Sequence, residues 1–206
     1  MKTDYTICLT SYPARMNNLP QVIENLWRQT IKPQNIILTI AGNQYKEMMP
    51  VLKDLQADIL VVLKDTKVWK KFLHALQGIE GLILAVDDDK LYTPTMAEEM
   101  LSVYDKYEQP VSGNHYWHNG LKCHCGCASL VWRDMFKGWQ RYEQMFDTMR
   151  SSDMFYTMLA AENHFAYRQT ETDFSKCVDF NPVQPYSKRG QVQETYLSFG
   201  KALNWF

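Results

Sequence analysis

The sequence predicts an α/β fold with a mostly parallel central sheet and helices on both of its faces. Two observations support this prediction. Short apolar runs rich in β-branched residues occur at residues 5–9, 36–40, 59–63 and 82–86, and such runs are typical of parallel strands that are covered on both faces. Segments of helix length separate the runs. This β–α alternation favours right-handed crossovers and a doubly wound sheet.

Two segments carry the apolar stripe of a core-facing helix. The first follows the strand predicted at residues 5–9, with Asn18 as a candidate N-cap and Pro20 in its first turn. Its stripe consists of Leu19, Val22, Ile23, Leu26 and Trp27. The second helix opens at residues 93–94 and ends at Pro110. Its stripe consists of Met96, Met100, Val103, Tyr104 and Tyr107.

The second half of the chain has a less regular pattern. Strands are predicted at residues 110–114 and 125–132, and helices at residues 133–149, 152–161 and 191–203. Residues 174–190 contain Pro182, Pro185 and Gly190, which predict an irregular loop. No repeat or linker divides the sequence, so we expect a single domain over residues 1–206.

Composition narrows the class of protein. A chain of 206 residues with 46% hydrophobic residues can bury a full core. Its formal net charge of −1 gives no overall attraction to nucleic acid, and we expect no nucleic-acid partner. We find no apolar segment of about 20 residues and no signal-peptide pattern at the start. We therefore expect a cytoplasmic protein without a transmembrane segment, for which peripheral membrane association stays open.

Three of the five cysteines, Cys123, Cys125 and Cys127, recur with period two. In a strand they would share one face, and their spacing differs from the C-x₂₋₄-C pairs typical of zinc sites. We expect free thiols that pack as small apolar residues.

Three consecutive carboxylates, Asp87, Asp88 and Asp89, follow the apolar run at residues 82–86; we call them the acidic triplet. Like charges side by side are unfavourable unless a cation neutralises them. In doubly wound sheets, ligands bind outside the carboxyl ends of the strands, where residues 10–15 and Asp65 are also expected. These segments therefore predict one crevice that holds a divalent cation.

Several short segments carry a family resemblance in their order and spacing. They are Thr-Ser-Tyr-Pro-Ala-Arg at residues 10–15, Trp-Arg-Gln-Thr-Ile-Lys-Pro at 27–33, Val-Asp-Asp-Asp at 86–89 followed by Tyr92, Asp65 followed by Lys-Phe-Leu at 71–73, and Ser-Asp-Met-Phe at 152–155. Together they resemble small bacterial glycosyltransferases of the GT-A fold, a Rossmann-like architecture, over roughly residues 5–165.

The resemblance implies a metal-dependent glycosyltransferase of the hexosyltransferase type. Such an enzyme moves a sugar from a nucleoside diphosphate, here UDP, to a glycan or a polysaccharide precursor. Residues 1–92 would form the nucleotide-binding half and residues 93–206 the acceptor half. The cofactor would be Mn²⁺ or Mg²⁺, which suit carboxylate ligands and stabilise a departing diphosphate. The Asp-x-Asp pattern implies Asp89 on the metal and Asp87 toward the ribose or a metal-bound water.

The donor nucleotide would lie against the loop at residues 11–15. Tyr12 would stack on the base and Arg15 would reach a phosphate. Asp65 could accept a hydrogen bond from the base, or it could be an ordinary turn residue at a strand end. Lys71 would face the diphosphate, or only solvent. The expected donor-binding residues are Thr10, Ser11, Tyr12, Arg15, Asp65, Lys71, Asp87 and Asp88.

Asp153 is the candidate general base, because an inverting transfer needs a carboxylate to take the proton of the acceptor hydroxyl. An acid in the first turn of a helix is also favoured for structural reasons, and a retaining enzyme would not need this base. Residues 125–132 depart from the glycine-rich strand of the family. A catalytically silent nucleotide-sugar or partner-binding module therefore remains the alternative.

Overall fold

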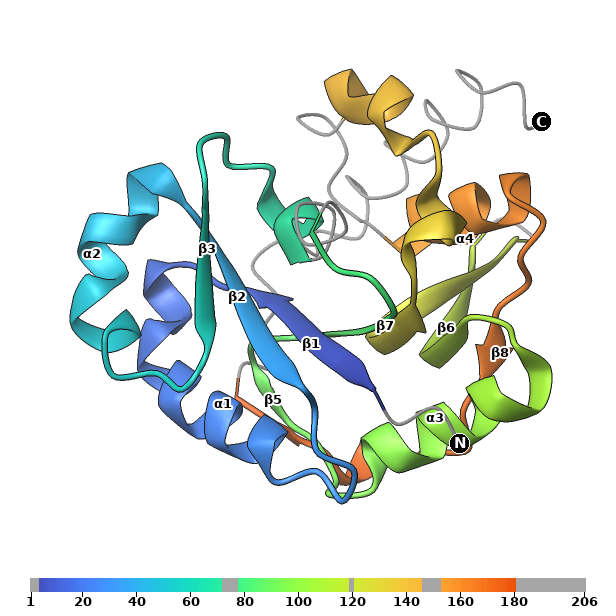
Figure 1. Ribbon diagram of the computed structural model, residues 1–206, viewed down its shortest axis with the longest axis horizontal. Helices are drawn as coiled ribbons and strands as arrows, with labels where there is room; N and C mark the ends of the chain where they lie inside the picture. The colour runs from blue at the N-terminus through green and yellow to red at the C-terminus, as the bar shows by residue number, and fades with distance from the viewer. Residues whose placement is uncertain (1–3, 72–77, 119–120, 146–152, 181–206) are drawn as a thin grey trace.

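The computed structural model describes residues 4–71, 78–118, 121–145 and 153–180. Within them, a seven-stranded sheet has the order β3-β2-β1-β4-β7-β6-β8 (Figure 1). Its strands are β1 (Tyr5–Thr10), β2 (Asn35–Ala41), β3 (Asp58–Val62), β4 (Leu82–Val86), β6 (Val111–His118), β7 (Leu121–Val131) and β8 (Arg168–Gln169). The first four strands are mutually parallel, and β7 alone runs against its neighbours β4 and β6. The predicted mostly parallel α/β sheet is confirmed.

Helices cover both faces of this sheet, as Figure 1 shows for α1 and α3 on one side and α4 on the other. The α-helices are α1 (Leu19–Trp27), α2 (Gly42–Leu52), α3 (Met96–Tyr107) and α4 (Asp153–Glu162). Alternate residues of β1 enter different cores: Ile7 and Leu9 pack with α1 and α3, whereas Cys8 packs with α4. Because successive side chains of a strand point to opposite faces of the sheet, the same strand contributes to both cores.

The helix predicted at residues 19–27 is confirmed, and four members of its stripe are fully buried. Asn18 occupies the N-cap position, but its side chain makes no capping hydrogen bond. The chain enters α1 directly from the 3₁₀-helix η1 (Pro13–Asn18), so Asn18 already has a helical backbone. A residue in that conformation cannot adopt the extended geometry of a capping residue.

Strand β3 departs from the prediction that its residues are covered on both faces. Val61 is 43% exposed and Leu63, just after the strand, is 99% exposed. The reason is position, because β3 is the edge of the sheet and pairs only with β2.

The second half agrees with the prediction in part. The strands expected at residues 110–114 and 125–132 are present as β6 and β7, both longer than predicted, and α4 matches the helix expected at residues 152–161. The segment predicted as helical at residues 133–149 forms two short 3₁₀-helices over its described part and not one continuous helix. They are η4 (Arg133–Phe136) and η5 (Trp139–Met145). The helix predicted at residues 191–203 lies outside the described residues.

A short strap follows β8 and pairs with the residues that follow the acidic triplet. It consists of the 3₁₀-helix η6 (Phe174–Lys176) and β9 (Val178–Asp179), which pairs with β5 (Lys90–Leu91) in a separate two-stranded sheet. The next residue, Phe180, donates its backbone N–H to the Asp89 carbonyl at 2.8 Å. The strap therefore supports the backbone of the acidic triplet.

A bulge interrupts β7 beside the acidic triplet. Cys127 and Ala128 together face the single residue Gly113 of β6, and Cys127 has a left-handed backbone with φ of 63°. Bulges are common beside functional sites because they redirect side chains. Cys8, Cys127 and Cys177 are free thiols.

Candidate functional site

The carboxyl ends of β1, β3 and β4 lead into three charged segments. These are the loop that enters η1, the turn at Asp65 with the 3₁₀-helix η2 (Lys67–Lys71), and the acidic triplet. Ion pairs join the first and second of these segments to the third: Arg15 contacts Asp88 and Asp89, and Lys71 contacts Asp87. The sheet therefore brings side chains from distant parts of the sequence to one edge.

Arg15 bridges two members of the acidic triplet. Its Nη1 lies 2.6 Å from Asp88 Oδ1, and its Nη2 lies 3.0 Å from Asp89 Oδ2. The guanidinium also lies over the ring of Tyr12, 5.3 Å from its centroid. Burial alone would lower the pKa of Arg15, but the two carboxylates outweigh burial and raise it. Arg15 is therefore fully charged and held in place.

The acidic triplet remains short of positive charge. Burial raises the pKa of Asp88, although Arg15 opposes the effect. Burial and the neighbouring Asp87 raise the pKa of Asp89 to about 6, against the influence of Arg15. The second oxygen of Asp88, Oδ2, is buried without a hydrogen-bond partner among the described residues. The ionised triplet would therefore gain from one more cation.

Lys71 links the acidic triplet to α4. Its Nζ lies 2.6 Å from Asp87 Oδ1, and its side chain is only 16% exposed. Burial lowers the pKa of Lys71, but the fields of Asp87 and, more weakly, Asp153 raise it. Asp153 is the first residue of α4. The structure therefore places this candidate base in the electrostatic environment of the site.

Asp65 is engaged by protein donors on both oxygens. Oδ1 accepts from the Lys67 backbone N–H at 3.1 Å and from Lys70, and Oδ2 accepts from Lys67 Nζ at 2.7 Å and from Gln44 at 3.4 Å. Partial burial would raise the pKa of Asp65, but these lysine contacts outweigh it and lower the pKa to about 2. This geometry is that of a turn residue that organises η2, the second of the two interpretations open from the sequence.

Thr10 and Ser11 are less available to a ligand than the sequence suggested. The Thr10 hydroxyl donates to the Thr39 carbonyl at 2.8 Å, so its proton is used within the sheet. Ser11 is 2% exposed. Tyr12 is half-buried beside Arg15 and is the residue of this loop that offers a ring face.

Tyr92 belongs to the candidate site, although the sequence indicated no role for it. Its buried hydroxyl accepts from the Asp87 backbone N–H at 2.8 Å and donates to the Cys127 carbonyl at 2.7 Å. Asn25 of α1 binds both backbone polar groups of Tyr92, at 2.8 and 3.0 Å. Tyr92 therefore joins the acidic triplet to the bulge of β7. Nothing in the sequence around Tyr92 indicates this contact, because the contact depends on the bulge of β7.

The two carboxylates expected to hold the metal have separate cationic partners in the structure. Lys71 contacts Asp87, and Arg15 contacts Asp89. In the described part of the chain, no group of three or more His, Cys, Asp or Glu side chains could hold a metal ion. The oxygen donors and the uncompensated charge fit Mn²⁺ or Mg²⁺. Most ligands of such an ion would have to come from substrate and water.

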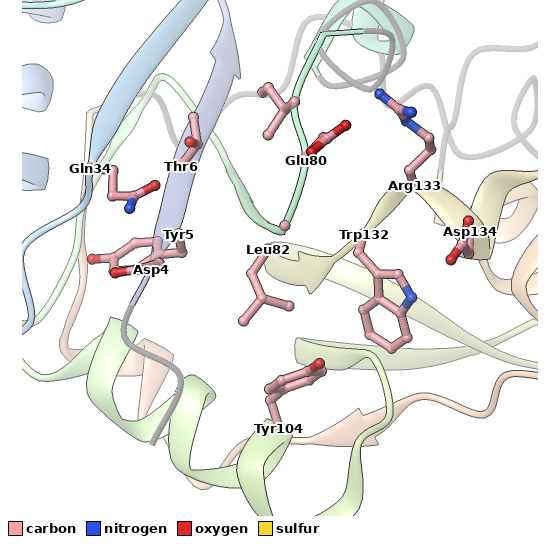
Figure 2. A pocket seen from close by; sticks show the side chains of 12 residues that line it. Asp4, Tyr5, Thr6, Gln34, Glu80, Leu82, Tyr104, Trp132, Arg133 and Asp134 are labelled. Carbon is pink, nitrogen blue, oxygen red and sulfur yellow. The ribbon is translucent and has the colours of Figure 1, made fainter.

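A cavity of about 750 Å³ lies elsewhere, at the amino ends of β1 and β4 (Figure 2). Trp132 and Tyr104 line one side of it, and Asp4 and Glu80 belong to its rim. The acidic triplet follows the opposite, carboxyl end of β4. The cavity is therefore separate from the charged cluster, which we take as the candidate functional site.

No protein-family model and no curated protein matches the chain. Solved structures match its fold. The 4-diphosphocytidyl-2C-methyl-D-erythritol synthase of Anaerococcus prevotii has a TM-score of 0.54 at 10% identity, covering 95% of this chain and 98% of that one. Mannosyltransferase PcManGT of Pyrobaculum calidifontis, in complex with GDP-Man and Mn²⁺, has a TM-score of 0.61 at 14% identity, covering 97% and 64%. S. aureus TarS, in complex with UDP, has a TM-score of 0.53 at 11% identity, covering 81% and 60%.

These similarities establish a GT-A-like fold. The chain spans less than two thirds of the PcManGT and TarS chains that it matches. Within the described ranges, no helix is both long enough and apolar enough to cross a membrane.

Proposed function

We propose that this protein is a metal-dependent glycosyltransferase that uses a nucleoside diphosphate sugar, with UDP as the favoured nucleotide. One observation carries the proposal most directly. Arg15, Lys71 and the acidic triplet meet at the carboxyl edge of a GT-A-like sheet, where ligands of doubly wound folds bind. The ligands of two matched structures support a nucleotide-linked donor. PcManGT is in complex with GDP-Man and Mn²⁺, and TarS is in complex with UDP.

The donor side of the proposed site consists of residues 1–92. The ring of Tyr12 would stack on the base, while Arg15 and Lys71 would face the two phosphates. Asp89, with Asp87 nearby, would hold Mn²⁺ or Mg²⁺. When bound, this cation would neutralise charge that develops on the departing diphosphate. Asp88 would keep Arg15 oriented.

The acceptor side of the proposed site consists of residues 93–206 and centres on Asp153. In an inverting transfer, the acceptor oxygen attacks the anomeric carbon as the bond to the diphosphate breaks and its electron pair leaves with the nucleotide. The Asp153 carboxylate would take the proton of the acceptor hydroxyl. Asp87 and Asp153 both raise the pKa of Lys71, so this one cation would interact with carboxylates of both halves. The acceptor would be a glycan or polysaccharide precursor, consistent with a cytoplasmic enzyme that visits the membrane surface.

The release of nucleoside diphosphate tests this function. The purified chain is incubated with UDP- and GDP-linked hexoses and Mn²⁺, with and without a mixture of glycan acceptors. We expect one donor to be consumed, and we expect Asp89→Ala to abolish the release. Asp105→Ala is the control, because Asp105 is an exposed acid on α3.

A thermal-shift experiment on the same chains separates an enzyme from a silent module. A nucleotide at 100 times its dissociation constant stabilises the fold by about 2.7 kcal/mol. Stabilisation by a donor sugar without any release of nucleotide would identify the silent nucleotide-sugar-binding module. The absence of both effects would contradict the proposed function.

A further inference from the structure

We propose that Arg15 is an internal counter-ion of the acidic triplet and competes with the divalent cation for Asp89. The diphosphate of an incoming nucleotide would relieve this competition by accepting the Arg15 guanidinium. The inference rests on the proposed function, since it describes how that same site is regulated.

The first argument is the strength of the Arg15 contacts. One guanidinium donates through Nη1 to Asp88 and through Nη2 to Asp89, at 2.6 and 3.0 Å. The three side chains are only 14%, 6% and 8% exposed. Charge-assisted bonds from a planar guanidinium are among the strongest that side chains make, and low exposure strengthens them further. Arg15 is therefore a tight occupant of these carboxylates.

The second argument is competition at a single atom. Asp89 is the proposed cation ligand, and its Oδ2 already accepts the Arg15 contact. A divalent cation on Asp89 would stand within a few ångströms of the guanidinium, and two positive charges at that distance repel each other. Strong binding of the cation therefore requires Arg15 to withdraw from Asp89.

The third argument is that Arg15 has capacity for another anion. Its Nε is buried and has no hydrogen-bond partner among the described residues. The ring of Tyr12, 5.3 Å from the guanidinium carbon, supports the cation independently of the carboxylates. A phosphate group could therefore take over Arg15 without leaving its charge unpaired.

This arrangement makes cation and nucleotide binding cooperative. Without nucleotide, only the molecules in which Asp89 is free of Arg15 can bind the cation. The apparent affinity for the cation is therefore the intrinsic affinity multiplied by the fraction of such molecules. With nucleotide, Arg15 is drawn to the phosphates and Asp89 is released. By linkage, each ligand must raise the affinity for the other by the same factor.

The test is a titration of the full chain with Mn²⁺ alone and with Mn²⁺ plus UDP, in which free Mn²⁺ is read from its electron paramagnetic resonance signal. The chains are wild type, Arg15→Gln, Arg15→Lys and Arg28→Gln. Arg28 is the matched control, because its side chain is 71% exposed and pairs with Glu24 away from the triplet. Arg15→Lys keeps a positive charge at the site, so it tests the idea even if Arg15→Gln folds poorly.

We expect Arg15→Gln to bind Mn²⁺ about tenfold more tightly than wild type in the absence of UDP, a change of about 1.4 kcal/mol. Arg15→Lys should fall between the two, because a lysine ammonium keeps the positive charge but lacks the rigid planar fork of arginine. Arg28→Gln should match wild type. UDP should raise the Mn²⁺ affinity of wild type but hardly that of Arg15→Gln.

Equal or weaker Mn²⁺ binding by both Arg15 variants, with UDP still bound by wild type, would overturn the inference and leave the proposed function standing. Failure of wild type to bind UDP with or without Mn²⁺ would overturn both.

Discussion

Four carboxylates of the candidate site pair with cationic side chains, and two of the four share one partner. Lys70 pairs with Asp65, Lys71 with Asp87, and Arg15 with the other two members of the acidic triplet. Such pairing holds side chains in fixed positions before any substrate arrives, which lowers the cost of ordering them during binding. Asp153 differs, since its role would be proton transfer and not charge compensation.

The first prediction concerns Asp153. Asp153→Asn removes the proposed base without changing the size of the side chain. We expect kcat for transfer to fall by about 10²- to 10⁴-fold, the usual contribution of general base catalysis. The KM for the donor should change little, because the proposed role of Asp153 is on the acceptor and not on the donor. Steady-state kinetics with the donor concentration varied at saturating acceptor measures both values. A kcat within threefold of wild type would exclude Asp153 as the base.

The second prediction concerns Tyr92. Tyr92→Phe removes a hydroxyl that bridges the Asp87 N–H and the Cys127 carbonyl. Two buried backbone groups lose a partner, so we expect the free energy of unfolding to fall by about 1–3 kcal/mol. Urea denaturation measures this change. Tyr107→Phe is the control, because Tyr107 is 43% exposed. Equal stability of the two variants would show that the bridge contributes nothing.

Among the structural elements, the strap depends on a close contact with β6. Phe174 of the strap lies against Gly113 so closely that a Cβ at residue 113 would stand 2.5 Å from Phe174 Cζ. Phe174 also meets the ring of Tyr92 edge to face, with centroids 6.4 Å apart. Beyond Phe174, the ion pair between Lys90 and Asp179 joins β5 to β9 at 2.6 Å.

The third prediction therefore concerns Gly113. Gly113→Ala should push Phe174 away and lower the free energy of unfolding by about 1–3 kcal/mol, as overpacking usually does. Because the strap supports Asp89, the affinity for UDP with Mn²⁺ should also fall. Gly78→Ala is the matched control, since a Cβ there would meet nothing within 4 Å. The melting temperature and UDP affinity are measured for both variants. Unchanged values for Gly113→Ala would refute the supporting role of the strap.

The sequence predicted the elements that bury a long periodic face. Strands β1, β2 and β4 and helices α1 and α3 carry such faces and were predicted within a few residues. Helix α2 was not predicted, because Pro50 lies inside it and only two of its residues are buried. Strands β5 and β9 have two residues each, too few for any periodicity to appear.

The sequence predicted the side chains of the candidate site better than their partners. The carboxyl ends of parallel strands lie at the same edge of a sheet, which indicated that Arg15, Asp65 and the acidic triplet would lie together. The order of residues in the sequence could not indicate which lysine of η2 would contact Asp65 and which would contact Asp87. That choice depends on the direction of a short 3₁₀-helix, which Asp65 itself sets by accepting the Lys67 N–H.

For the molecule as a whole, the fourth prediction concerns stability at acidic pH. The pKa of Asp65 is about 2 in the folded protein against its ordinary 3.8, so the unfolded chain takes up this proton first as the pH falls. The contribution of Asp65 to stability is therefore complete above about pH 5 and is lost progressively between about pH 5 and pH 1. It amounts to about 1–2 kcal/mol after allowance for solvent screening.

Urea denaturation of wild type and Asp65→Asn between pH 2 and 6 measures this contribution. The two stability curves should approach each other toward pH 2 and separate progressively up to about pH 5, with wild type the more stable. A constant difference between the curves over the whole range would show that ionisation of Asp65 is not the cause.

A crystal structure of the chain with UDP and Mn²⁺ would show whether the charged cluster binds the nucleotide. We expect Mn²⁺ on a carboxylate oxygen of Asp89, with the diphosphate beside Arg15 and Lys71 and the base near Tyr12. A nucleotide bound in the cavity beside Trp132, at the opposite end of the sheet, would contradict this expectation.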